Sequence, residues 1–184
     1  VEVSKHQPMK LAAMEGLYNG EKRAPLTAFG ILTPNKKFND GKEPFLLKMN
    51  IPCGLSLLAK GESDAYIPGI NDLVYGVEYR DVDGNTVVIP SFEERQKRGR
   101  VAVAAFGEFK KAEEDGNIAQ MELQEKILME NFDSFGYGYL NEPNDIIPPV
   151  PLTFYSFRIM VILGGYFLLL FIVILLMLRR QSKG

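Results

Sequence analysis

Cysteine and histidine are almost absent from this chain of 184 residues, which contains only Cys53 and His6 of these two types. A single cysteine excludes an internal disulfide bond. One cysteine and one histidine also cannot supply the usual ligand set of a structural zinc site. The formal charge of −2 gives no indication of nucleic-acid binding, because the basic excess that attracts phosphates is missing.

Motifs of self-contained enzymes are absent as well. The sequence has neither a P-loop nor the glycine fingerprint of a dinucleotide-binding fold. A Ser/His/Asp set would have to use His6, which lies close to the first residue. A soluble enzyme domain on a membrane anchor is therefore disfavoured, because no catalytic set can be assembled.

One long apolar run dominates the C-terminal part of the chain. The segment from Ile159 to Leu178 reads IMVILGGYFLLLFIVILLML and contains no charged residue. A helix of this length, at about 1.5 Å per residue, spans about 30 Å, the thickness of the hydrocarbon core of a bilayer. The run predicts a transmembrane helix over residues 151–180.

The charges beside the apolar run predict its orientation. Arg179, Arg180 and Lys183 follow the run, and cations favour the cytoplasmic side of a membrane. We therefore expect residues 181–184 to form a cytoplasmic tail and residues 1–150 to be extracytoplasmic. The alternative is a tail-anchored protein with its large domain in the cytoplasm, and the same cations argue against it.

The chain begins at Val1 and has no signal peptide. An extracytoplasmic region then needs an upstream segment that carries it across the membrane. We therefore expect the chain to be a fragment of a polytopic, all-α membrane protein whose further helices precede Val1.

Helical patterns prevail before the apolar run, so a mainly α fold class is predicted for a small helical and loop region. Residues 7–18 combine helix formers with a proline in the first turn. Residues 91–132 form the strongest helical region, with a break at 115–117. Residues 77–90 are typical of a β-hairpin around an Asp-Gly-Asn turn. Residues 20–50, rich in Gly, Pro, Asn and Lys, are expected to be irregular loop.

The first of two chemically informative segments runs from Gln7 to Glu15 and reads QPMKLAAME. It predicts a short helix on which Lys10 and Glu15 are five residues apart. Five steps of about 100° place these side chains about 140° apart, so they cannot form an i,i+4 ion pair. Each must find a separate partner, or both must converge on a group outside the helix. As isolated residues they would be ordinary solvated side chains.

The second segment runs from Thr153 to Met160, reads TFYSFRIM and lies at the outer end of the apolar run. Arginine at a membrane boundary usually reaches the headgroups, and methionine in an apolar helix usually packs. A thioether can also ligate haem iron, and a guanidinium can hold a haem propionate. Two helical steps place Arg158 and Met160 about 200° apart, so the two cannot approach a haem from one face.

Together and in this order, the two segments resemble subunit I of cytochrome bd quinol oxidases. In that family a QPxKLAAxE motif opens an extracytoplasmic loop, the Q-loop, and an FWSFRIM-like motif begins the next transmembrane helix. The resemblance implies that residues 1–150 form the Q-loop region and that Lys10 and Glu15 bind quinol. It also implies that Met160 is an axial ligand of the low-spin haem b. Arg158 would stabilise the reduced haem electrostatically. Tyr155 stands where the family often has tryptophan, so an interfacial aromatic residue is kept.

The resemblance further implies a quinol:O2 oxidoreductase in the cell (inner) membrane. Membrane quinol would be oxidised at the outer face, and electrons would pass through the low-spin haem b to a second haem b and a haem d that reduces O2 to water. The expected partners are the remaining helices of subunit I, subunit II, quinol and the lipid bilayer. Because the family's opposing histidine ligand lies on an earlier helix, the fragment alone is expected to be inactive.

A hypothesis of a different class is a single-span, membrane-anchored binding or assembly protein without a redox role. It predicts that residues 1–150 fold alone. It also predicts that Lys10 and Glu15 can be replaced without consequence.

Overall fold

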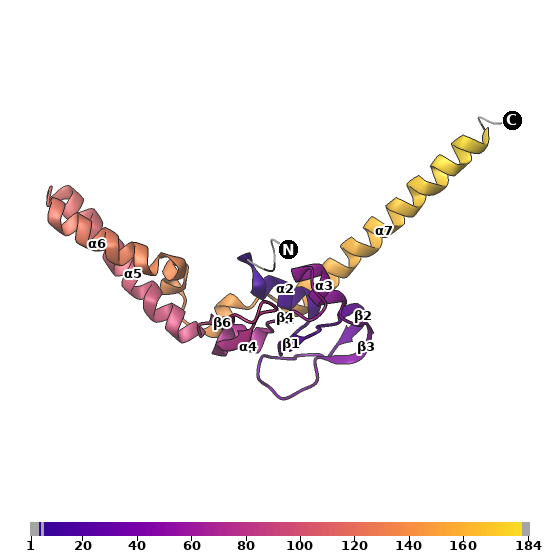
Figure 1. Cartoon of the computed structure of the whole chain (residues 1–184), viewed down its shortest axis with the longest axis horizontal. Helices are drawn as coiled ribbons and strands as arrows, with labels where there is room; N and C mark the ends of the chain where they lie inside the picture. The colour runs from indigo at the N-terminus through magenta and orange to yellow at the C-terminus, as the bar shows by residue number, and fades with distance from the viewer. Residues whose placement is uncertain (1–3, 5, 182–184) are drawn as a thin grey trace.

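The computed structural model describes residues 4 and 6–181. Figure 1 shows a central region from which two helical elements project, the long helix α7 on one side and an arm formed by α5 and α6 on the other. Most of the described residues are helical, which confirms the mainly α prediction. The strands are short and form three separate two-stranded sheets.

Helix α2 (Pro8–Glu15) lies in the central region and begins and ends for clear local reasons. Pro8 occupies the first turn, where a backbone N–H would have no helical partner. Gly16 ends the helix with a φ of 63°, a left-handed conformation that glycine adopts without steric cost. The predicted helix over residues 7–18 is confirmed, although it ends at Glu15.

The main hydrophobic core joins α2, α4 (Ile70–Tyr75) and the first turns of α7 (Val150–Gln181). The alanines of α2 are fully buried and allow the helices to approach closely. The buried members of this core are Ala12, Ala13, Tyr18, Leu32, Ile70, Leu73, Val150 and Phe154. Helix α7 is therefore anchored to the central region through its N-terminal end.

The predicted hairpin over residues 77–90 is confirmed. Strand β5 (Val77–Arg80) pairs antiparallel with β6 (Thr86–Ile89). Gly84 in the turn has a φ of 81°, and its N–H donates to the carbonyl of Asp81.

The expectation of irregular loop over residues 20–50 is wrong. Strand β2 (Leu26–Leu32) pairs antiparallel with β3 (Phe45–Ile51), and β1 (Glu21–Lys22) pairs with β4 (Tyr66–Ile67). The turn-forming residues are concentrated in the connection over 33–44, whereas the flanking segments are apolar enough to form strands. The seven-residue helix α3 (Gly54–Lys60) follows β3 and packs on β2.

The predicted helical region over residues 91–132 is confirmed as two helices, α5 (Phe92–Glu114) and α6 (Ile118–Asn131). The Ser91 hydroxyl accepts a hydrogen bond from the N–H of Glu94 and caps α5. The 3-10 helix η1 (Phe132–Tyr139) then packs back on α5. This return brings the glycine–aromatic segment against the arm.

Helix α7 follows the short 3-10 helix η2 (Pro143–Ile146) and has 32 residues, or about 48 Å at the usual rise. Among the described residues, one helix is long and apolar enough to cross a membrane, and α7 forms its apolar part. The apolar side chains from Ile159 to Leu178 are exposed, since no other described segment packs on them. This is the form expected of a helix whose surroundings are lipid or other membrane helices.

Candidate functional site

The structure joins the two informative segments through a buried ion pair between Glu15 and Arg158. Arg158 Nη2 lies 2.8 Å from Glu15 Oε2, and Nη1 lies 3.3 Å from Oε1. The two residues are separated by 143 positions in the chain. The fork of the guanidinium therefore meets both carboxylate oxygens, the geometry of a strong bidentate pair.

The fold brings these side chains together at the contact between α2 and α7. Glu15 is the last residue of α2, and Arg158 lies one helical turn after Phe154, which is fully buried in the core. The Arg158 guanidinium carbon lies 4.6 Å from the centroid of the Phe154 ring and 5.3 Å from that of Phe157. Stacking on aromatic rings and pairing with a carboxylate both restrict the arginine to one orientation.

The ion pair is shielded from water. The side chain of Glu15 is 3% exposed and that of Arg158 is 12% exposed. Burial raises the pKa of the Glu15 carboxyl above its ordinary value, while Arg158 and a hydrogen bond with the backbone of Thr27 act in the opposite direction. Arg158 Nε is buried and has no hydrogen-bond partner among the described residues. A carboxyl with a raised pKa is suited to accepting a proton.

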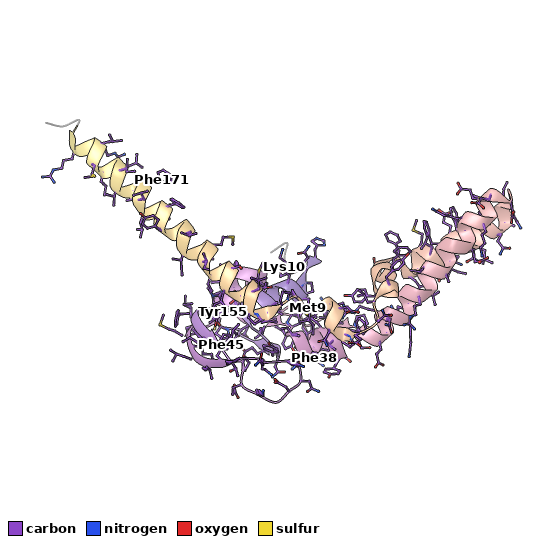
Figure 2. All side chains as sticks on the ribbon, turned by 180° about the vertical axis from the view of Figure 1, so that it is seen from behind. Met9, Lys10, Phe38, Phe45, Tyr155 and Phe171 are labelled. Atoms are coloured by element: carbon purple, nitrogen blue, oxygen red, sulfur yellow. The ribbon has the colours of Figure 1, made fainter. Side chains whose placement is uncertain are left out.

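Lys10 lies apart from this ion pair. Its side chain, labelled in Figure 2, is exposed. It lines a cavity of about 440 Å³ together with His6 and Asp145. Glu15 lines two other cavities, of about 210 and 120 Å³. The sequence left open whether Lys10 and Glu15 have separate partners or converge on one group, and the structure does not bring the two side chains to one cavity.

Met160 lies on α7 two residues after Arg158, and its side chain is 60% exposed. The described residues contain no group of three or more His, Cys, Asp or Glu side chains that could hold a metal ion. An exposed thioether on a membrane helix has the donor chemistry of one axial ligand of a haem. The chemistry and exposure of Met160 are therefore compatible with the ligand role that the resemblance implies.

Two residues at the Lys10 cavity were not recognised in the sequence. Arg95 of α5 donates to the Tyr137 hydroxyl over 2.7 Å and to the carbonyl of Leu73, and its guanidinium lies 4.8 Å from the Tyr137 ring centroid. Arg95 belongs to a charge-rich helix, and the charged residues of such a helix are expected from the sequence to be solvated. A pairing over 42 positions leaves no local signal in the sequence.

A family model described as cytochrome bd terminal oxidase subunit I matches residues 1–183. No curated protein matches the chain.

Proposed function

Because the chain belongs to the cytochrome bd terminal oxidase subunit I family, we propose that it is the quinol-binding part of such a subunit. Membership implies an oxidoreductase of respiratory electron transport that acts in a membrane. In our proposal residues before about 150 are extracytoplasmic and the C-terminal end is cytoplasmic. The complete protein is multi-pass in the cell (inner) membrane and oxidises membrane quinol at the outer face.

The observation that carries this proposal is the ion pair between Glu15 and Arg158. It connects the helix of the QPMKLAAME segment with the helix that bears Met160. A proton acceptor and a candidate haem ligand are thereby held at the same end of one apolar helix. Quinol oxidation requires this combination, since each quinol gives up two protons together with two electrons.

Glu15 acts as the proton acceptor. Its carboxylate is buried, and its raised pKa makes it a better base than a solvated glutamate. When Glu15 takes up a proton, its pairing with Arg158 weakens and the guanidinium is freed for a neighbouring anion. Lys10, which lines the 440 Å³ cavity, holds a quinol oxygen or a partner carboxylate from that side.

Met160 would hold a low-spin haem b through its thioether, and Arg158 would stabilise the reduced haem electrostatically. A bound haem would supply the electron-accepting chemistry that quinol oxidation needs, and a histidine on another helix of the subunit would complete its ligands. Because both terminal nitrogens of Arg158 are engaged by Glu15, its influence on a haem depends on the protonation of that carboxyl.

The complete oxidase supplies what this chain does not contain. The remaining helices of subunit I and subunit II complete the complex, which also carries a second haem b and the haem d that reduces O2 to water. The overall reaction is quinol:O2 oxidoreduction. The isolated fragment is expected to be inactive.

The test is to replace Met160 with leucine in the complete oxidase and to record the reduced-minus-oxidised spectrum. The low-spin haem band should be lost or displaced, while Met177→Leu, at the other end of the same helix, should leave it unchanged. An unaltered band in Met160→Leu would refute the ligand assignment.

A second test separates this proposal from a single-span binding or assembly protein without a redox role. Glu15→Gln removes the proton acceptor with little change in shape. Quinol oxidation should fall by about 100-fold or more, the usual contribution of a general base. An oxidase that keeps full activity with both Lys10→Gln and Glu15→Gln would reject a role of these two residues in quinol oxidation, which is the outcome that the non-redox alternative predicts for them.

A further inference from the structure

The outer face of the β2–β3 sheet is apolar and uncovered. In the antiparallel register Phe29 lies opposite Met49, and Ile31 lies opposite Leu47. These four side chains and Ile51 are between 42% and 63% exposed. We call the five residues Phe29, Ile31, Leu47, Met49 and Ile51 the hydrophobic hairpin face.

The other face of the same sheet is used differently. Thr27 and Leu32 of β2 are buried against the central region. Lys48 stands between Leu47 and Met49 and belongs to this inner side, because neighbouring strand residues alternate between faces. Its ammonium lies 5.8 Å from the centroid of the Phe45 ring. The hydrophobic hairpin face therefore carries no charge. A contiguous apolar surface of this kind marks a contact with a partner or a membrane.

The hairpin lies beside the first turns of α7. The N–H of Leu32 donates to the Tyr155 hydroxyl over 3.1 Å, and the Phe45 and Phe154 rings lie 5.6 Å apart. Figure 2 labels Phe45 and Tyr155 near the start of α7. At the other end of the hairpin, Leu26 and Phe157 line the same 120 Å³ cavity. The hairpin thus runs level with residues 154–157, immediately before the charge-free run that starts at Ile159.

We propose that the hydrophobic hairpin face contacts lipid in the leaflet at which α7 begins. Leu57 and Leu58 of α3, a helix that packs on β2, are 55% and 63% exposed and add apolar surface beside the hairpin. The proposal rests on position, since the hairpin that carries this face packs its other side on the outermost turns of the membrane span. Figure 1 shows β2, β3 and α3 on the side of the central region from which α7 projects, whereas the α5–α6 arm lies on the opposite side.

A position at the depth of the lipid headgroups is compatible with the backbone of the hairpin as well as with its side chains. A two-stranded sheet has unpaired edges, which the hydrocarbon core does not tolerate but the hydrated headgroup region does. The hairpin is then a shallow anchor that holds the region containing Glu15 at a fixed depth.

The experiment uses the complete oxidase reconstituted in phospholipid nanodiscs. Met49→Cys is labelled with a nitroxide in a background where Cys53 is serine and other reactive cysteines are removed. Collision of the label with O2, which concentrates in lipid, is compared with collision with a water-soluble nickel chelate. Leu47→Cys gives a second reading, in case one label disturbs the hairpin.

Val88→Cys is the matched control. Val88 lies on β6 and is 64% exposed, against 63% for Met49, so the two positions are equally exposed within this chain. We expect the ratio of O2 to nickel collision to be several-fold higher at Met49 than at Val88. Equal ratios would place the face in water and overturn the proposal. Exclusion of both reagents at Met49 and Leu47 would show that another protein segment covers the face, which also overturns it.

This inference needs only the membrane location and is independent of quinol chemistry. A lipid-exposed label in an oxidase without Glu15-dependent activity would leave it standing while rejecting the proposed function.

Discussion

Replacing Arg158 with glutamine in the complete oxidase should loosen the end of α2. The change removes the cation and leaves Glu15, whose side chain is 3% exposed, as a buried charge without its partner. Breaking a buried pair in this way costs about 3–5 kcal/mol. Because Glu15 can offset part of this cost by binding a proton, the effect should be largest at alkaline pH.

Hydrogen exchange measures this cost locally. A loss of about 3–5 kcal/mol in the free energy of local opening lowers the protection of the α2 amides by about two to three and a half orders of magnitude. The amides of α5, which lies in the arm, should keep their protection. Exchange is followed by mass spectrometry on the oxidase in nanodiscs, with α5 as the internal reference.

Arg98→Gln is the control, because it also removes an arginine but breaks an exposed ion pair. Arg98 Nη2 lies 2.6 Å from Glu94 Oε1 on the surface of α5, where the two side chains are 54% and 49% exposed. An exposed pair of this spacing contributes at most about 0.5 kcal/mol. If α2 protection in Arg158→Gln changes no more than α5 protection changes in Arg98→Gln, the buried pair does not exist in the oxidase.

Three further outcomes are expected. As pH falls through the raised pKa of Glu15, its carboxylate is protonated and no longer accepts the quinol proton, so kcat/KM falls. Arg158→Gln removes an influence that lowers this pKa, so the acid limb of the pH–rate profile should move to higher pH; a limb that stays in place would show that another group titrates. Lys10→Gln should lower kcat/KM for quinol by about 10- to 100-fold through the loss of one charge-assisted hydrogen bond, with unchanged thermal stability because Lys10 is exposed. Gly99→Ala should weaken the packing of η1 on α5, since a Cβ there would lie 2.4 Å from backbone atoms of Ser134 and Gly138. Gly107→Ala, on the same helix with nothing within 4 Å of the added Cβ, should instead stabilise α5 by about 0.5–1 kcal/mol, and hydrogen exchange of α5 distinguishes the two.

The sequence predicted those elements whose structure is decided by residues close together in the chain. The apolar run from Ile159 to Leu178 and the turn at Gly84 each carry their own signal, because length in one case and left-handed backbone in the other decide the structure. The β2–β3 sheet was missed for a related reason. Its connection is longer than its strands, so the composition of residues 20–50 reflects the loop.

The pairing of Glu15 with Arg158 could not be predicted from either segment. Helical geometry excluded an ion pair between Lys10 and Glu15, and this exclusion was sound. The identity of the partner depends on how α2 packs against α7, over a separation of 143 residues. Tertiary packing of this range leaves no periodic trace in the sequence.

The energetics of the ion pair argue that it serves chemistry more than stability. Replacing a buried pair by apolar side chains of similar volume is often neutral or stabilising, because both desolvation costs disappear. Glu15→Leu combined with Arg158→Met should therefore leave the protection of α2 equal to or above that of the unmodified oxidase, while quinol oxidation is lost. A double variant that is both strongly destabilised and active would reverse this interpretation, since the pair would then hold the fold together without taking part in proton transfer.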